Sequence, residues 1–207
     1  MRWAYDAIES ITKHSDDADD AVATSVELCN VTAGRSIKLS SSCSGIMAPE
    51  LAARAVAHAF NKHNMKLYND VYGTHMPAYL LCQVEPTWIC ECNKQCQQEA
   101  LNQPDGLSPE HVFVDQLDFL QDHVKSKLDT MRAASADSVR ALILGSPLKQ
   151  RGYCIKHNRR CNADRCHSNN TGTPCVNFSR IGTHTGFAGD NRVFWTWARH
   201  RIDLKEP

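Results

Sequence analysis

The sequence predicts an α/β fold, with a Rossmann-like parallel sheet and flanking helices. Three observations predict this class. Short apolar runs alternate with helix-like segments in the order of successive βαβ units. The first run ends in a Ser-Gly turn, and Pro49 then stands where the first turn of a helix accepts proline. With 207 residues, the chain is long enough for one domain with a hydrophobic core.

The first elements follow from the spacing of apolar residues. Residues 1–36 predict a polar helical leader, because their first apolar residues share one helical face. Residues 37–48 predict a short strand that runs into the turn. The helix that starts at Pro49 keeps an apolar stripe at helical spacing as far as Phe60. Residues 61–77 are polar and predict a loop.

Three further strands complete the predicted sheet. The apolar run 78–84 predicts a buried second strand, and the helix after it ends near Leu101. Residues 111–115 predict the third strand, and residues 122–136 predict the helix that follows. The apolar residues 141–144 predict the fourth strand, which a Gly-Ser-Pro sequence ends.

The last part of the chain departs from this rhythm. Residues 149–171 are rich in Arg, Asn, Cys and His and carry almost no apolar side chains, so we expect an insert outside the core. A final helix is predicted over Asn191–Ile202. The predicted organisation is therefore a leader (1–36) and one domain (37–207) that contains the insert.

Composition and charge narrow the classes of function. The formal net charge is zero, with 23 basic and 23 acidic residues, so no overall basic character indicates nucleic acid binding. No run of 18 apolar residues is present, and the N-terminus lacks the apolar core of a signal peptide, so we expect no membrane partner. The ten cysteines are then expected to be reduced thiols, metal ligands or a nucleophile, and not disulfides.

One loop carries the clearest chemical signal. Residues 172–182 read Gly-Thr-Pro-Cys-Val-Asn-Phe-Ser-Arg-Ile-Gly, in which Pro174 gives Cys175 a rigid, turned backbone. This segment resembles the catalytic loop of the cytosine-5 DNA methyltransferases, usually Gly-x-Pro-Cys-Gln-x-Phe-Ser-x-x-Gly, although Val176 replaces the Gln. The matching residues are Gly172, Pro174, Cys175, Phe178, Ser179 and Gly182, followed at the family's spacing by Gly186, Phe187, Asp190 and Arg192. The alternative is a Gly/Pro-rich surface turn with an incidental cysteine.

This resemblance implies a DNA (cytosine-5-)-methyltransferase that takes its methyl group from S-adenosyl-L-methionine. In such an enzyme the Cys175 thiolate adds to cytosine C6 and makes C5 nucleophilic. The resemblance also implies substrate-binding roles for Ser179 and Arg180, and it counts Pro174 among the cofactor-binding residues. The target base must leave the duplex, because C6 lies within the base stack.

The same resemblance implies a cofactor site where the strands end, since open α/β sheets bind ligands beyond the carboxyl ends of their strands. The turn Cys43-Ser44-Gly45-Ile46 would approach the methionine part of the cofactor. It matches the family's Phe-x-Gly-x-Gly loop only in part, because Cys43 replaces the aromatic residue and Met47 stands near the position of the second glycine.

The next two strand ends supply the other implied contacts. Glu85, read as the end of the second strand, would accept hydrogen bonds from the ribose hydroxyls, and Trp88 would pack on the adenine. Asp115 would accept a hydrogen bond from the adenine amino group, with Asp118 as a competitor. The alternative for the first pair is an exposed turn glutamate and a half-buried tryptophan.

The resemblance stops short of a whole catalytic domain. The family's Glu-Asn-Val and Gln-x-Arg-x-Arg motifs and its target recognition region are not found, so the sheet is expected to be incomplete at its C-terminal side. A complementing chain that carries the missing half is an expected partner. DNA is the expected substrate, with RNA left open, and the expected location is nuclear in a eukaryote and cytoplasmic otherwise.

The expected insert carries possible metal ligands. Its spacing is Cys154-x2-His157-x3-Cys161-x4-Cys166, and thiolates and imidazoles at such short spacings suit Zn²⁺. The alternative is a flexible basic loop that touches phosphates. Two further classes of function stay open: a zinc-dependent nucleic-acid-binding module without catalysis, and a degenerate α/β scaffold that binds a partner through the edge of its sheet.

Overall fold

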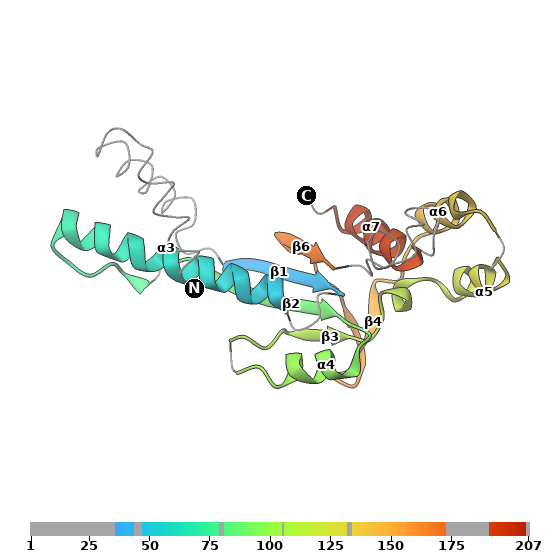
Figure 1. Ribbon diagram of the computed structural model, residues 1–207, viewed down its shortest axis with the longest axis horizontal. Coiled ribbons are helices and arrows are strands. Elements are labelled where there is room, and N and C mark those ends of the chain that lie inside the picture. Colours follow the sequence, from blue (N-terminus) through green and yellow to red (C-terminus); the bar gives the residue numbers. More distant parts are fainter. Residues whose placement is uncertain are drawn as a thin grey trace, which may run out of the picture. The chain divides into compact units, whose positions relative to one another are not determined.

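The computed structural model of the chain (Figure 1) describes residues 36–43, 47–78, 81–104, 106–131, 134–172 and 191–205. They form a six-stranded mixed sheet with flanking helices, which confirms the predicted α/β, Rossmann-like class. The predicted leader lies outside these residues, apart from Ser36 at the start of the first strand. Within these ranges, no helix is both long enough and apolar enough to cross a membrane.

The sheet joins a parallel part to an antiparallel hairpin. Its strands are β1 (Ser36–Ser42), β2 (Gln83–Cys90), β3 (His111–Phe113), β4 (Arg151–Cys154), β5 (Arg159–Asn162) and β6 (Ser168–Thr171), in the order β5-β4-β3-β2-β1-β6. The pairs β1–β6 and β2–β3 are parallel, and the arrows of β1, β2 and β3 point the same way in Figure 1. The pairs β3–β4 and β4–β5 are antiparallel. The parallel part, β3-β2-β1-β6, therefore has the 3-2-1-4 order of a doubly wound sheet.

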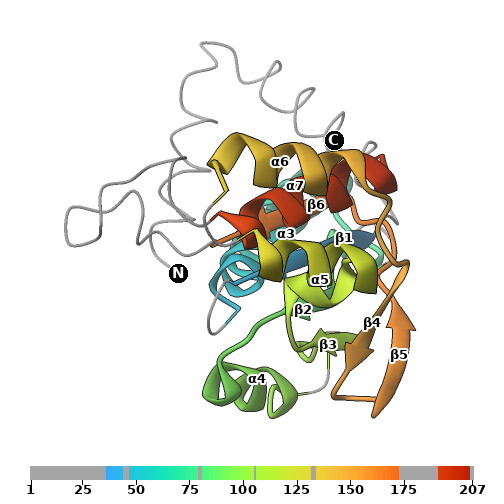
Figure 2. The ribbon, with the colours of Figure 1, turned by 90° about the vertical axis from the view of Figure 1, so that its right-hand side faces the viewer.

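The contacts of the chain group it into two compact units. The helices are α3 (Ala48–Tyr72), α4 (Lys94–Leu101), the 3-10 helix η2 (Gln116–Phe119), α5 (Asp122–Thr130), α6 (Ala136–Gly145) and α7 (Arg192–Leu204). One unit includes Pro49–Glu85, and in it the Asn61 side chain both donates to and accepts from the Cys82 backbone at 2.8 Å. The other unit contains Lys38–Ala48 and the chain from Pro86 onward, and it holds almost all of the sheet. Figure 2 shows α5, α6 and α7 of this second unit side by side.

Two predicted boundaries around the second strand are wrong. The loop predicted over 61–77 is largely helical, because α3 continues to Tyr72 and ends where Gly73 takes a left-handed φ of 65°. The strand predicted over 78–84 starts later, at Gln83, and continues past Pro86 to Cys90.

The predicted fourth strand, 141–144, is also wrong, since these residues are helical and belong to α6. A short apolar run does not distinguish a strand from a buried helix. Here Val139, Leu142 and Ile143 follow helical spacing and pack in a core shared with α5 and α7. The fourth parallel strand is β6 instead, which carries no aliphatic side chain.

Side chains alternate between two cores along β2 and β3, as the two-residue period of a strand requires. Trp88 faces the first core and Ile89 the second. The first core contains Trp88, Cys90, Phe113, Phe119, Cys154, Cys161, Ala163 and Cys166. The second contains Met47, Ile89, Ala100 and Val112, and a third, formed by α5, α6 and the chain before α5, contains Leu120, Val124, Leu128 and Ile143.

The expectation that residues 149–171 lie outside the core is wrong. They form β4, β5 and β6, and their cysteines at 154, 161 and 166 are buried in the first core. A free thiol behaves as a small hydrophobic group, so this segment contributes apolar contacts without a leucine-rich or valine-rich pattern. It is therefore part of the sheet and not an insert beside it.

Gly152 in β4 lies directly under two aromatic rings of the first core. A Cβ at this position would be 2.7 Å from Cζ of Phe119 and 3.0 Å from Cδ1 of Phe113. Gly152→Ala is therefore expected to lower the free energy of unfolding by about 1–3 kcal/mol, because it overpacks a filled core. Urea unfolding measures this loss. Gly145→Ala is the matched control, since its Cβ would meet nothing within 4 Å, and an equal loss in both variants would contradict the account.

Buried polar groups connect β1, η2 and α7. Ser42 Oγ donates to Gln116 Oε1 at 3.0 Å, and Gln116 Nε2 lies 3.4 Å from His200 Nδ1. Burial, and secondarily the positive charge of Arg201, lowers the pKa of His200 from 6.5 to about 3. The imidazole is therefore neutral in the folded protein at every pH near neutrality.

Because of His200, the free energy of unfolding is expected to decrease as the pH is lowered below 6.5. Its pKa is lower in the folded than in the unfolded chain, so below pH 6.5 the unfolded chain binds a proton more readily. The stability present above pH 6.5 is lost progressively as the pH falls towards 3, with about 2 kcal/mol lost by pH 5. Urea unfolding at pH 7 and at pH 5 tests this. Between these two pH values, the free energy of unfolding of His200→Gln should fall by about 2 kcal/mol less than that of the wild type. Identical pH dependence in the two proteins would disprove the assignment.

Candidate functional site

The sheet has a topological switch point between β1 and β6. From β1 the chain moves through β2, β3 and the β4–β5 hairpin, and it then returns as β6 to the other side of β1. The two strands end together, since the Gly172 amide donates to the Ser42 carbonyl at 2.9 Å. Cys43 and Gly172, the residues that directly follow these two strands, therefore lie at the same edge of the sheet. Open α/β sheets bind their ligands at this kind of position.

Three side chains that can form polar contacts lie at the carboxyl ends of β1, β2 and β3. Cys43 follows β1, and its amide donates to the Cys90 carbonyl at 2.7 Å. Glu91 follows β2, is 6 % exposed, and its carboxylate accepts from the Asn93 amide at 2.9 Å. Asp115 follows β3 and caps η2, accepting from the Leu117 amide at 2.9 Å.

The carboxylates give this edge a negative potential. Burial, and then the negative charges of Glu91, of Cys92 once it is ionised at high pH, and of Asp115, raise the pKa of the Cys43 thiol to about 12. Cys43 therefore stays protonated near neutral pH and is not a nucleophile there. A negative edge of this kind favours a ligand with positive charge.

The backbone around the turn after β1 is strained. Cys43 has φ 53° and Met47 has φ 62°, a left-handed conformation that residues other than glycine rarely adopt. Such residues concentrate at functional sites, where the surrounding structure holds them in place.

Two predicted cofactor residues do not reach this edge. Glu85 is the third residue of β2, exposed and near the amino end of the strand, so its placement at the strand's carboxyl end is wrong. Trp88 is not half-buried but fully buried in the first core, where its Nε1 donates to the Asp164 carbonyl at 2.9 Å. The carboxylate that does follow β2 is Glu91, which the sequence interpretation missed because it ended the strand at Glu85–Pro86.

The prediction of Asp115 over Asp118 agrees with their positions. Asp115 comes two residues after β3, whereas Asp118 lies within η2 and forms an ion pair with Lys125 at 3.0 Å. The other predicted residues of the methyltransferase site lie outside the described residues; they are Ser44, Gly45, Ile46, Pro174, Cys175, Ser179 and Arg180.

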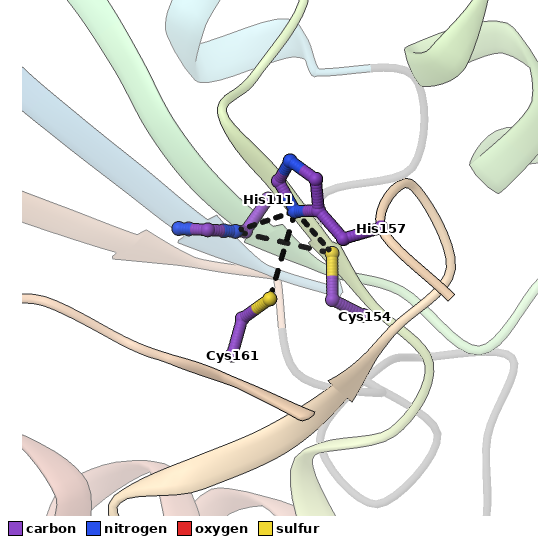
Figure 3. A group of neighbouring side chains, drawn as sticks. All are labelled: His111, Cys154, His157 and Cys161. Carbon is purple, nitrogen blue, oxygen red and sulfur yellow. Dashed lines mark hydrogen bonds between the residues drawn. The ribbon is translucent and has the colours of Figure 1, made fainter. Parts of the chain in front are cut away.

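A His/Cys cluster lies on the antiparallel side of the sheet (Figure 3). His111 begins β3, Cys154 ends β4, His157 lies in the hairpin turn, and Cys161 lies in β5. One ligand atom from each residue lies within 4.8 Å of the other three, so the four can share one metal ion. Burial, as the largest influence, lowers the pKa of His111 from 6.5, so its imidazole is neutral and able to bind a metal.

Three of the four predicted metal ligands, Cys154, His157 and Cys161, belong to this cluster, whereas Cys166 does not. Cys166 Sγ lies 2.8 Å from Thr87 Oγ1 and donates to the Asp164 carbonyl, within the first core. The fourth member is His111, which precedes Cys154 by 43 residues and joins the cluster only because β3 pairs with β4.

An open hollow of about 400 Å³ lies beside the cluster. His111 and Cys161 contribute to its wall together with arginines 151, 159 and 160, which are exposed. Several guanidinium groups around one hollow favour an anionic partner such as a phosphate.

Comparison with known proteins assigns no relative. No model of a protein family matches the chain, and no curated protein is significantly similar to it.

Proposed function

We propose that this chain is the cofactor-binding part of a DNA (cytosine-5-)-methyltransferase. The observation that carries the proposal is the position of Gly172, the residue at which the Pro-Cys segment begins in the sequence. Gly172, its first residue, directly follows β6, and β6 lies in parallel beside β1. The segment 172–182 therefore starts at the switch point of the sheet, next to the turn that begins at Cys43.

The position of β6 removes a discrepancy between this chain and the family. The family places its catalytic loop immediately after the fourth strand, whereas the run 141–144 lies well before Cys175. Because 141–144 is helical and β6 (Ser168–Thr171) is the fourth parallel strand, the loop follows the fourth strand here as well. This agreement between topology and motif supports the proposal.

S-adenosyl-L-methionine fits the residues at the carboxyl edge. Glu91 provides a carboxylate after β2, which suits the vicinal hydroxyls of a ribose, and it replaces Glu85 in this role. Asp115 provides an acceptor after β3 for the adenine amino group. The negative potential around Cys43 suits the positive sulfonium and amino groups of the cofactor. When bound, the cofactor supplies an electrophilic methyl group.

Cys175 is the nucleophile of the proposed reaction. Its thiolate adds to C6 of a cytosine, which gives C5 the electron density that methylation requires. With the methyl group from the cofactor on C5, loss of the C5 proton would break the C6–S bond and restore both the aromatic ring and the thiolate. Arg180 and Ser179 of the same loop bind the substrate, which is a cytosine turned out of the DNA duplex.

Methyl transfer to nucleic acid tests this function. The chain is incubated with cofactor labelled in its methyl group and with duplex DNA, single-stranded DNA or transfer RNA. The proposal expects label in DNA as 5-methylcytosine, identified by mass spectrometry of the nucleosides. Label in transfer RNA alone would change the substrate class, and label on another base or on protein would overturn the proposal.

A second candidate function is a zinc-dependent nucleic-acid-binding module without catalysis. It is favoured by the arginine-lined hollow beside the His/Cys cluster, for which Zn²⁺ is the most suitable ion. A chain that binds DNA in a salt-dependent manner, and that neither binds S-adenosyl-L-methionine nor transfers its methyl group, would support this alternative.

A further inference from the structure

We propose that His111, Cys154, His157 and Cys161 bind one Zn²⁺ ion in a closed, four-coordinate site that fastens the β4–β5 hairpin to β3. The site goes beyond the proposed methyl transfer and does not depend on it. Two thiolates with two imidazoles form one of the common ligand sets of structural zinc. Softer thiolate donors also disfavour Mg²⁺ and Ca²⁺, which prefer oxygen ligands.

Four of the six distances between the donor atoms are close to those of a tetrahedron around zinc, and the other two are within 4.8 Å. Zn–N bonds of about 2.05 Å and Zn–S bonds of about 2.3 Å place two nitrogens about 3.3 Å apart, and a nitrogen and a sulfur about 3.6 Å apart. In the structure, Nδ1 of His111 and Nδ1 of His157 are 3.1 Å apart. Cys154 Sγ lies 3.9 Å from the first and 3.5 Å from the second, and Cys161 Sγ lies 3.6 Å from His157 Nδ1. An ion can therefore enter with only small movements of the side chains.

The hairpin backbone brings three of the ligands to one point. Cys154 and Cys161 lie on opposite strands of the β4–β5 ladder, and His157 lies in the turn between them. Asn158 takes a left-handed φ of 50° in this turn, which asparagine tolerates better than most residues. The chain thus presents the ligands as Cys-x2-His-x3-Cys on one tight hairpin.

His111 has a neighbour that suits a metal-bound imidazole. Its Nε2 lies 3.6 Å from Glu110 Oε1, on the side of the ring away from the cluster. A carboxylate at this nitrogen holds the proton there and leaves the lone pair of Nδ1 for a metal ion. The negative charge of Glu110 on this side favours the tautomer in which Nδ1 is free to bind zinc.

The position of the cluster indicates a structural role. Four protein ligands leave no open coordination position for a substrate or water. The cluster lies at the amino end of β3, whereas Asp115 follows the carboxyl end of the same strand. The β3–β4 ladder has one register pair, Phe113 with Cys154, with a further bond from the Ile155 amide to the Val112 carbonyl at 2.9 Å. A zinc ion bound by both His111 and the hairpin would add strong bonds to these few backbone contacts between β3 and β4.

Metal analysis and cobalt substitution test the site. The whole chain, purified without chelator, is expected to carry about one zinc ion, and Cys161→Ser and His111→Gln are each expected to reduce this by about tenfold or more. Cys166→Ser is the matched control, since Cys166 is equally buried in the same core but bonds Thr87, and it should keep the zinc. Cys175→Ser should keep it as well.

The spectrum of bound cobalt identifies the ligand types in the wild-type chain, so this test does not depend on whether a variant folds. Co²⁺ added to the metal-free wild-type chain should give the intense visible bands of a tetrahedral ion and the near-ultraviolet bands of two thiolate ligands. The proposal is overturned if the folded chain binds no zinc or cobalt. It is also overturned if the spectrum shows an octahedral ion without thiolates, or if Cys166→Ser releases the metal while His111→Gln retains it.

Discussion

Glu91→Gln is expected to weaken the binding of S-adenosyl-L-methionine by about 100-fold, which corresponds to roughly 3 kcal/mol. In the proposed complex the charge of the carboxylate would strengthen its hydrogen bonds to the ribose hydroxyls, and a neutral amide would replace one acceptor by a donor. The amide oxygen can still accept from the Asn93 amide, so the turn after β2 is expected to keep its shape. Isothermal titration calorimetry measures the affinity.

Glu85→Gln is the matched control for this experiment. It makes the same chemical change on the same strand, at an exposed position near the amino end of β2. The affinity of this variant is expected to equal that of the wild type. If Glu85→Gln weakened binding and Glu91→Gln did not, the cofactor site would not lie at the carboxyl edge.

Cys175→Ser is expected to lower the rate of methyl transfer by on the order of 10³-fold or more, with the cofactor affinity unchanged. A serine hydroxyl is almost never ionised near neutral pH, so it cannot add to cytosine C6 as a thiolate does. The measurement is the initial rate of 5-methylcytosine formation at saturating cofactor.

Cys96→Ser controls for the loss of a thiol as such. Cys96 lies on α4, is partly exposed, and does not belong to the His/Cys cluster. Its variant should transfer methyl groups at the wild-type rate. A Cys175→Ser chain that retained the wild-type rate would rule out covalent catalysis by this residue.

The sequence predicted the parts of the fold that local patterns determine. The alternation of strands and helices gave the α/β class, and the strand at β1, the strand at β3 and the helix at α7 were placed correctly. The bounds predicted for β2 were wrong mainly because Pro86 was taken as the end of the strand. Pro86 is tolerated inside β2, where its carbonyl accepts from the Glu110 amide at 3.1 Å. Because of this one misplacement, the sequence pattern assigned to Glu85 the role that we propose for Glu91.

The strand β6 could not be predicted from apolar periodicity. Its residues, Ser-Asn-Asn-Thr, gain their place beside β1 from polar contacts. Asn169 accepts from the indole of Trp197 at 2.5 Å, and Thr171 donates to the Ser42 carbonyl at 3.2 Å. A strand held by side-chain hydrogen bonds has the same composition as a loop, so the sequence interpretation left it in an insert.

The candidate metal site shows the same division between local and long-range information. Cys154, His157 and Cys161 lie on one hairpin, and their short spacing in the sequence already grouped them as candidate ligands. His111 lies on another strand, and Cys166, which continues the sequence pattern, turns into the core. The pairing of β3 with β4 determines that His111, and not Cys166, joins the cluster. Nothing in the local sequence indicates this pairing.

The most direct test of the central claim is to trap the Cys175 adduct. The chain is incubated with S-adenosyl-L-methionine and DNA that carries 5-fluorocytosine, in which the fluorine at C5 prevents the elimination that frees the thiol. The account predicts a covalent protein–DNA complex that survives denaturation, with the nucleotide attached to Cys175 in the peptide mass spectrum. A chain that binds both the cofactor and this DNA, and forms no adduct or forms one at another cysteine, would contradict it.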